Sequence, residues 1–182
     1  MAPPLTRAEK ARRTRRRMLD AAALLFTERG WAGTTIEGLA RTAEGGVQTV
    51  YFTFGNKRAL LKELLDTVIA RDATPVATLD RPWARAVIEE PDPAAQLAQQ
   101  AVGARQILQR AAPVLEVVRG AAAADLEMAE LWRTGQLQWH TVQLRFAEAL
   151  VTKVDGPLRD GHDAASAADI ALTLLGPEPT LC

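Results

Sequence analysis

Residues 45–57, which read GGVQTVYFTFGNK, combine apolar and hydrogen-bonding side chains within one short segment. At helical spacing one face is apolar, and it consists of Val47, Val50 and Phe54, with Tyr51 at its edge. The opposite face carries Gln48, Thr49, Phe52 and Thr53. Amide and hydroxyl groups beside an aromatic ring suit recognition of a partner by hydrogen bonds and packing. The spacing therefore predicts a helix that packs with one face and offers the other for binding.

The residue types that support catalysis or metal binding do not occur together in this sequence. His140 and His162 lie far apart, without the spacing of metal ligands, and Cys182 has no intrachain partner. We find no phosphate-binding glycine loop and no nucleophile elbow. We therefore expect no enzyme activity, no cofactor and no metal. The single cysteine fits a reducing cytoplasm and excludes a disulfide framework.

The charges are unevenly distributed along a chain whose formal net charge is zero. Residues 1–63 carry 12 Lys and Arg against 6 Asp and Glu, whereas residues 64–182 carry 10 against 16. This asymmetry suggests a polyanionic partner for the N-terminal part, and the alternative is a solvated basic tail. Apolar runs are too short to span a bilayer, so we expect no membrane partner.

The N-terminal third predicts a basic arm followed by helices. Residues 1–13 are charged and contain two prolines, which predicts a disordered arm. A helix is expected from Thr14 until Gly30 stops it, and Thr34 with Glu37 forms a capping-box pattern for a second helix.

The rest of the chain also predicts helices, and strand alternation is absent from the sequence. The helix predicted within residues 45–57 begins after two glycines, and Asn56 caps a fourth helix. A domain boundary is expected near residues 70–75. Asp92 followed by Pro93 predicts the start of a helical series that is interrupted at Pro113 and near Gly120. A last helix capped by Asp163 completes an all-α fold.

Two short helices with a tight turn, the second with a polar outer face, constitute a helix-turn-helix. The segments AAALLFTERGWAGTTIEGLARTAE and VQTVYFTFGNKRALL resemble the N-terminal domain of the TetR (tetracycline-repressor) family over about residues 14–65. The residues that fit the family's pattern are Phe26, Gly30, Trp31, Thr34, Thr35, Ala40, Tyr51, Phe54 and Lys57.

The resemblance implies a three-helix DNA-binding domain at residues 14–70, with the helix-turn-helix at about 35–54. An α-helical effector-binding and dimerisation domain is then expected at residues 71–182. The implied function is a cytoplasmic, homodimeric transcriptional regulator, a repressor that a small hydrophobic or aromatic effector releases from a palindromic double-stranded operator.

The resemblance also implies a set of DNA contacts: Thr34, Thr35, Gly46, Val47, Gln48, Thr49, Tyr51, Phe52, Thr53 and Lys57. Thr34 is expected mainly to cap its helix and Thr35 to touch the DNA backbone, as are Tyr51 and Lys57. Gln48 is expected to bond adenine, while Thr49 packs on a thymine methyl group. The basic arm would add nonspecific attraction, or enter a minor groove.

The turn before the recognition helix departs from the family's usual Ala-Gly-Val-Ser. Here Glu44, Gly45 and Gly46 replace the turn glycine, the buried valine and the capping serine. Glu44 would be strained in a left-handed conformation unless Gly45 took over that role. We expect a looser turn within a preserved fold. Thr53 also replaces a histidine that is common in the family, which removes one phosphate contact.

The C-terminal part is expected to be short compared with the family. This leaves an alternative function open, namely a truncated interaction module that is monomeric or pairs with a full-length relative. For the effector pocket of the C-terminal domain, the candidate residues are Trp83, Arg105, Trp132, Trp139 and His140. A mostly apolar pocket with few polar groups would suit a hydrophobic effector.

Overall fold

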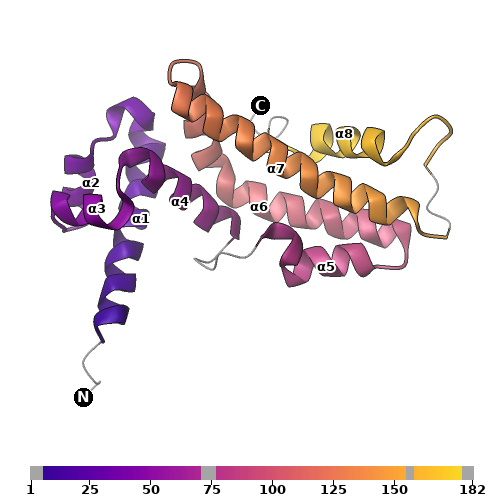
Figure 1. Ribbon diagram of the computed structural model, residues 1–182, viewed down its shortest axis with the longest axis horizontal. Coiled ribbons are helices and arrows are strands. Elements are labelled where there is room, and N and C mark those ends of the chain that lie inside the picture. Colours follow the sequence, from indigo (N-terminus) through magenta and orange to yellow (C-terminus); the bar gives the residue numbers. More distant parts are fainter. Residues whose placement is uncertain (1–5, 71–76, 155–157, 178–182) are drawn as a thin grey trace. The chain divides into compact units, whose positions relative to one another are not determined.

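The computed structural model describes residues 6–70, 77–154 and 158–177. These residues form helices and no strand, so the predicted all-α class is confirmed (Figure 1). In chain order the helices are α1 (Arg7–Gly33), α2 (Ile36–Thr42), α3 (Val47–Phe54), α4 (Lys57–Ala70), η1 (Thr78–Asp80, a 3₁₀ turn), α5 (Pro82–Glu89), α6 (Pro93–Ala122), α7 (Leu126–Val151) and α8 (Ala164–Leu175).

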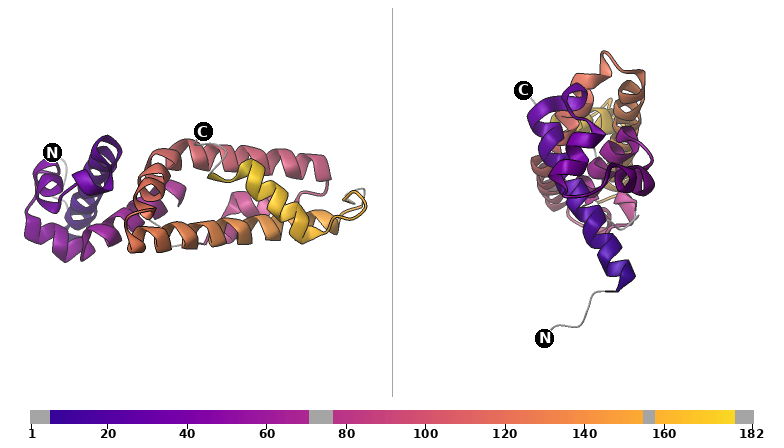
Figure 2. Two further views of the ribbon diagram at one scale, coloured as in Figure 1. Left: turned by 90° about the horizontal axis from the view of Figure 1, so that it is seen from above. Right: turned by 90° about the vertical axis from the view of Figure 1, so that its left-hand side faces the viewer.

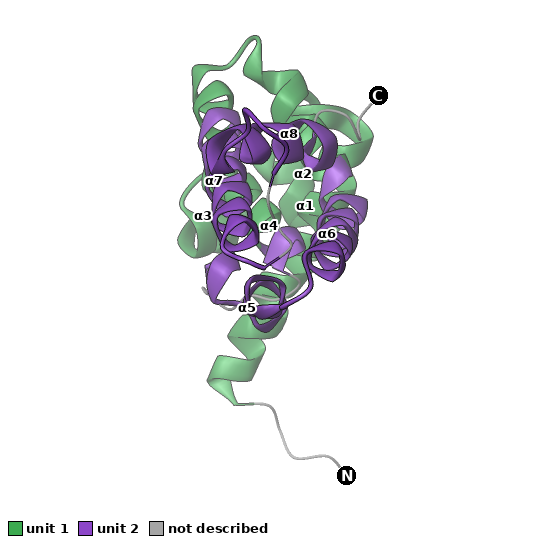
Figure 3. Ribbon diagram, turned by 90° about the vertical axis from the view of Figure 1, so that its right-hand side faces the viewer, with its two compact units in different colours: residues 1–66, 113–131 green, residues 67–112, 132–182 purple. Residues whose placement is uncertain are grey.

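The chain divides into two compact units (Figure 3). Unit 1 comprises Met1–Asp66 and Pro113–Leu131, and unit 2 comprises Thr67–Ala112 and Trp132–Cys182. The turn that joins α6 to α7 therefore belongs to unit 1, although most of both helices belongs to unit 2. The functional domain boundary near residue 70 stays a prediction.

Unit 1 is held together by the apolar faces of its short helices. α1 buries Met18, Ala22, Leu25 and Phe26; α2 buries Ile36, Leu39 and Ala40; α3 buries Val50 and Phe54; α4 buries Leu60, Leu61, Leu64 and Leu65. Burial of these side chains is the main force that holds the short helices in place. The inward face that the spacing predicted for residues 47–54 is confirmed at Val50 and Phe54, which are buried.

The beginning of α1 corrects the prediction of a disordered arm. Residues 1–5 lie outside the described residues, but the helix begins at Arg7. Thr6 and Glu9 form a capping box, with a 2.7 Å hydrogen bond from the Thr6 N–H to Oε2 of Glu9 and a 3.2 Å bond from the Glu9 N–H to Oγ1 of Thr6. These bonds satisfy backbone donors at the helix start, and the Lys- and Arg-rich sequence that follows is a good helix former.

Helix α6 also differs from the prediction, because it continues through Pro113 to Ala122 without interruption. A proline removes one helical hydrogen bond. The neighbouring side chains of Ala111 and Val114 are buried, so packing compensates for the lost bond. The predicted start is confirmed, since Oδ2 of Asp92 accepts a 2.9 Å hydrogen bond from the N–H of Ala95.

In unit 2 the residues of α6 and α7 run antiparallel, and α8 lies alongside them (Figure 2). Asp163 caps α8 as predicted, with its carboxylate accepting a 2.8 Å hydrogen bond from the Ser166 N–H. A small core cluster combines Ala84 and Val87 of α5 with Phe146 of α7. Within the described ranges, no helix is both long and apolar enough to cross a membrane.

Candidate nucleic-acid interface

The turn between α2 and α3 is closed by two backbone hydrogen bonds. The N–H of Glu44 donates to the carbonyl of Arg41 at 3.1 Å, and the N–H of Gly45 donates to that of Ala40 at 2.8 Å. This pair of bonds is the Schellman arrangement, which places one residue in the left-handed region. That residue is Glu44, with φ = 50°. The turn is therefore hydrogen-bonded rather than loose, and Gly45 does not take over the left-handed role.

The two glycines of this turn each lack a side chain that would have a different role: packing at Gly45 and helix capping at Gly46. A Cβ atom on Gly45 would lie 3.5 Å from Cε of Met18, which is an ordinary contact, so the turn has room for a side chain against the core. Gly46 is the N-cap of α3 and forms no side-chain cap. Consequently no cap side chain occupies the first backbone N–H groups of α3, at Val47 and Gln48, and these donors suit a phosphate.

The N-cap of α2 is Thr35 rather than the predicted Thr34. Oγ1 of Thr35 accepts a 3.0 Å hydrogen bond from the Gly38 N–H, so Thr35 is the N-cap of α2. Thr34 is 1% exposed, and its hydroxyl group lies 3.0 Å from the Leu25 carbonyl and 2.9 Å from that of Gly30. The capping box predicted at Thr34 is wrong by one residue, because burial of Thr34 moves the cap to Thr35.

The outer face of α3 is exposed, as its spacing predicted. Gln48 and Thr49 are exposed, and Phe52 is 93% exposed. Tyr51 lies at the edge of this face and is 49% exposed. Thr53 is only half-buried, and its hydroxyl group donates a 2.7 Å hydrogen bond back to the Thr49 carbonyl. A helix with an exposed amide, hydroxyl and aromatic ring can bind the edges of bases.

Lys57, at the start of α4, lies against the loop between α1 and α2. Its ammonium group donates hydrogen bonds to the carbonyls of Trp31 at 2.7 Å and Thr34 at 2.9 Å, and it lies 4.0 Å from the centre of the Trp31 ring. Burial lowers the pKa of this ammonium group, and the nearby Asp125 carboxylate counteracts the shift. The two carbonyls use two of the three N–H donors of the ammonium group.

Asp125 reaches the same aromatic ring from the turn between α6 and α7. Its Oδ2 atom accepts a 2.8 Å hydrogen bond from the indole N–H of Trp31, while Oδ1 accepts from the backbone N–H groups of Glu127 and Met128. Hydrogen bonds from the Met128 N–H and then from the Trp31 indole lower the pKa of Asp125. Sequence analysis did not identify Asp125, and its place before a helix suggests only a cap.

The basic residues of α1 fall into two groups. Most are exposed: Arg7, Lys10, Arg12, Arg13, Arg16, Arg17 and Arg29. Arg15 is half-buried and pairs with Glu63 of α4 through two of its nitrogen atoms. The expected basic surface is therefore present without Arg15, which the sequence did not distinguish from its neighbours.

Trp83, a predicted pocket residue, packs against the core cluster of unit 2. Its ring lies 6.0 Å from that of Phe146 in an edge-on arrangement. A Cβ atom on Gly103 would approach the Trp83 ring to 2.8 Å, so the missing side chain of Gly103 makes room for the tryptophan. This environment is that of a packing residue.

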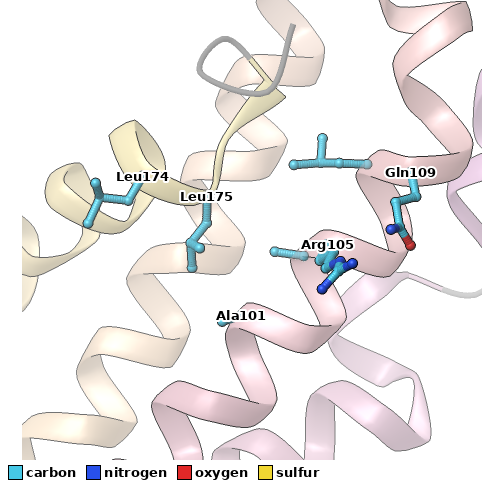
Figure 4. A pocket seen from close by; sticks show the side chains of 7 residues that line it. Ala101, Arg105, Gln109, Leu174 and Leu175 are labelled. Atoms are coloured by element: carbon cyan, nitrogen blue, oxygen red, sulfur yellow. The ribbon is translucent and has the colours of Figure 1, made fainter.

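Arg105, another predicted pocket residue, lines a cavity of about 300 Å³ in unit 2 (Figure 4). The lining residues are Ala101, Ala104, Arg105, Leu108, Gln109, Leu174 and Leu175. Leu175 points from α8 toward the side of α6 that carries Ala101 and Arg105 (Figure 4). An apolar wall with one guanidinium group could hold a small hydrophobic molecule.

The three remaining pocket candidates lie on α7 but do not line that cavity. His140 Nε2 lies 3.1 Å from Oδ1 of Asp169 on α8, and Trp132 is half-buried. The indole nitrogen of Trp139 is buried and has no hydrogen-bond partner among the described residues.

Three buried glutamines between α6 and α7 were not predicted from the sequence. Gln96 donates a 2.8 Å hydrogen bond to the Phe146 carbonyl, and Gln100 donates a 2.5 Å bond to Oε1 of Gln143. The Oε1 atom of Gln96 is buried, with no partner in the described part of the chain. The four-residue spacing of Gln96 and Gln100 within an apolar helix was the available signal.

Comparisons with known proteins agree with the helix-turn-helix geometry. The sequence model of the family described as "Bacterial regulatory proteins, tetR family" matches residues 18–64. A curated relative, the HTH-type transcriptional repressor NicS of Pseudomonas putida, is 34% identical over 64 residues. That alignment covers 35% of this chain and 30% of the relative, so it spans less than a third of that protein's length.

Solved structures resemble the chain over most of its length. A crystal structure of NalD, the secondary repressor of the MexAB-OprM multidrug efflux pump in Pseudomonas aeruginosa, matches with a TM-score of 0.70 at 23% identity, covering 92% of this chain and 82% of that chain. FadR of Bacillus subtilis in complex with stearoyl-CoA matches with a TM-score of 0.69 at 16% identity, covering 91% and 84%. At these identities the likeness concerns the fold.

The fold and the α2–α3 geometry define a helix-turn-helix protein with a helical C-terminal part. The resemblance to the TetR family inferred from the sequence is confirmed, because the family's sequence model matches residues 18–64.

Proposed function

We propose that the chain is a DNA-binding transcriptional regulator, a repressor that leaves a palindromic operator when a small hydrophobic or aromatic effector binds to its C-terminal helices. The observation that carries this proposal is the exposed outer face of α3. Phe52 is 93% exposed there beside exposed Gln48 and Thr49. An exposed helix face that carries an amide, a hydroxyl group and an aromatic ring suits contacts to base edges and thymine methyl groups.

The side chains of α3 favour A·T base pairs at the contacted positions. The helix VQTVYFTF contains no Lys or Arg, which are the usual partners of guanine. Gln48 can bond adenine in two places, and Thr49 and Phe52 can pack on thymine methyl groups. Thr35, Tyr51 and Lys57, together with the first N–H groups of α3, are the proposed contacts to phosphates.

The proposed effector site is the cavity beside Arg105 in unit 2. Its wall includes Leu108 and Leu175, which suits a hydrophobic ligand. The family mechanism then requires the effector to favour a conformation that binds the operator poorly.

Selection of duplexes from a randomised library by the wild-type chain tests DNA binding. We expect a palindromic consensus with A·T pairs at the contacted positions, because a two-fold dimer reads two equal half-sites. The double variant Gln48→Ala/Tyr51→Ala should lose binding to the selected duplex while its circular dichroism spectrum stays unchanged. Gln138→Ala, an exposed glutamine on α7, is the matched control and should bind as the wild type does. Equal binding by the double variant would contradict the proposed interface.

The alternative function, a monomeric interaction module, predicts a different molar mass. The structural likeness extends over more than nine-tenths of the chain, which does not favour an isolated module. Light scattering at micromolar concentration should give twice 19.7 kDa for the proposed homodimer. A mass of 19.7 kDa would support the alternative.

A further inference from the structure

Arg15 of α1, whose side chain is 43% exposed, contacts the last turn of the recognition helix within unit 1. Its Nε atom donates a 2.5 Å hydrogen bond to Oε1 of Glu63, and a second nitrogen atom pairs with Oε2 of the same carboxylate. The third nitrogen donates a 3.3 Å hydrogen bond to the carbonyl of Thr53. The guanidinium carbon also lies 4.9 Å from the centre of the Phe54 ring.

The Thr53 carbonyl is one of the carbonyls at the C-terminal end of α3 that no N–H of the same helix can reach. The last four carbonyls of a helix lack such partners, and their negative partial charge favours a nearby cation. In α3 the Tyr51 carbonyl accepts from the Gly55 N–H at 2.8 Å, while the Thr53 carbonyl accepts from Arg15. One guanidinium group therefore supports the final two residues of α3, Thr53 and Phe54.

The fork of hydrogen bonds to Glu63 fixes where that guanidinium group lies. A carboxylate that binds arginine through two parallel bonds sets both its position and its plane. Arg15 therefore connects α1, α3 and α4 at one point. The adjacent Arg16 is exposed, so neighbouring residues of the same type differ in role.

We propose that Arg15 is a positioning residue for sequence-specific DNA recognition: clamped by Glu63, it holds the C-terminal turn of α3 so that Gln48 and Phe52 face the bases. This inference rests on the proposed DNA-binding function. It separates Arg15 from the exposed arginines of α1, which attract phosphates without regard to sequence.

The affinities of each variant for two duplexes distinguish a positioning role of Arg15 from a direct contact between Arg15 and phosphate. Fluorescence anisotropy would measure the affinity of each variant for the library-selected duplex and for a mixed-sequence duplex of equal length, at several KCl concentrations. We expect Arg15→Met to lower the ratio of the two affinities about tenfold, as loss of a charge-assisted bond can. Its salt dependence on the mixed duplex should stay that of the wild type. Arg15→Lys, which keeps the charge without the fork, should recover the ratio only in part.

Arg16→Met is the matched control with the opposite expected result. Loss of one phosphate contact should weaken binding to both duplexes equally and reduce the slope of log K against log salt by about 0.9. If Arg15→Met behaves in the same way, or leaves both affinities unchanged, the positioning role is wrong.

Hydrogen exchange without DNA separates positioning from general destabilisation. Arg15→Met should accelerate exchange of the Gly55 amide, which closes α3, while the Gly45 amide of the preceding turn exchanges as in the wild type. Equal acceleration at both amides would overturn the proposal. If the wild-type chain selects no duplex at all, the proposed function fails, and the exchange result alone decides whether Arg15 holds α3.

Discussion

The indole N–H of Trp31 donates a 2.8 Å hydrogen bond to Oδ2 of Asp125, a residue 94 positions further along the chain. The same ring carries the ammonium group of Lys57 on its face, 4.0 Å from its centre. Trp31 thus connects the start of α4 with the first turn of α7 inside unit 1. These contacts make the stability of unit 1 sensitive to the charge of Asp125.

The first prediction concerns acid stability and Asp125. Its pKa is lowered from an ordinary value of 3.8, first by the Met128 N–H and then by the Trp31 indole. A lowered pKa in the folded state stabilises the fold above the ordinary value, and this contribution is lost as the pH falls through the lowered value. The variant Asp125→Asn should therefore have a lower urea midpoint than the wild type at pH 7, and the difference should vanish in acid.

The pKa of Asp125 itself supplies the control. Trp31→Phe removes the indole donor but keeps a ring, so the pKa of Asp125 should rise toward its ordinary value when followed by carboxyl NMR shifts. The pKa of Asp163, which hydrogen bonds from Ser166 lower within unit 2, should not change. An unchanged Asp125 titration in Trp31→Phe would contradict the role of the indole bond.

The second prediction concerns the left-handed residue of the α2–α3 turn. A side chain in the left-handed region costs roughly 1–2 kcal/mol, which glycine avoids. Because Glu44 has φ = 50° and only a 4.0 Å exposed ion pair with Arg17, Glu44→Gly should raise the free energy of unfolding by about 1 kcal/mol.

Glu37→Gly is the matched control for this change. Glu37 is exposed within α2, where glycine is a poor helix former, so the same substitution should destabilise by about 1 kcal/mol. Urea unfolding followed by circular dichroism measures both. Destabilisation by Glu44→Gly would mean that the Glu44 side chain contributes more than its strained backbone costs.

The third prediction concerns the contact between Gly103 and Trp83. A methyl group at residue 103 would lie 2.8 Å from the indole ring, so Gly103→Ala should destabilise by about 1–3 kcal/mol through overpacking. At Gly135 of α7 a Cβ atom would meet nothing within 4 Å, and Gly135→Ala should stabilise by up to about 1 kcal/mol. Thermal unfolding measures the stability of both variants. Equal changes in stability would contradict the packing role of Gly103.

The fourth prediction concerns the ammonium group of Lys57. Lys57→Met leaves the carbonyls of Trp31 and Thr34 without their donor, so the fold should lose about 1–3 kcal/mol. Lys62→Met removes only an exposed ion pair with Asp66 and should change stability by less than about 1 kcal/mol. Urea midpoints measure the stability of both variants. If Lys57→Met is as stable as the wild type, these hydrogen bonds contribute little.

Much of the local structure could be predicted because its signals lie close together in the sequence. The caps at Asp92 and Asp163 each depend on a side chain that bonds the backbone three residues later. The faces of α3 follow from a spacing of three and four residues. Such short-range patterns were enough to predict an all-α chain and its helix-turn-helix.

Other features could not be predicted, because adjacent residues of one type compete for the same role. Thr34 and Thr35 both suit an N-cap, and burial of Thr34 against Leu25 decided between them. Similarly, Arg15 and Arg16 are equivalent in composition, yet only Arg15 meets Glu63.

The sequence by itself determined most of the helices, the inward face of α3 and the resemblance of the N-terminal residues to the TetR family, because these depend on spacings of a few residues. The tertiary structure decided which arginine supports the recognition helix and which carboxylate meets Trp31. Those contacts join Arg15 to Glu63 and Trp31 to Asp125 across 48 and 94 positions. Pairing over such separations depends on how the apolar faces pack, and no local pattern in the sequence encodes it.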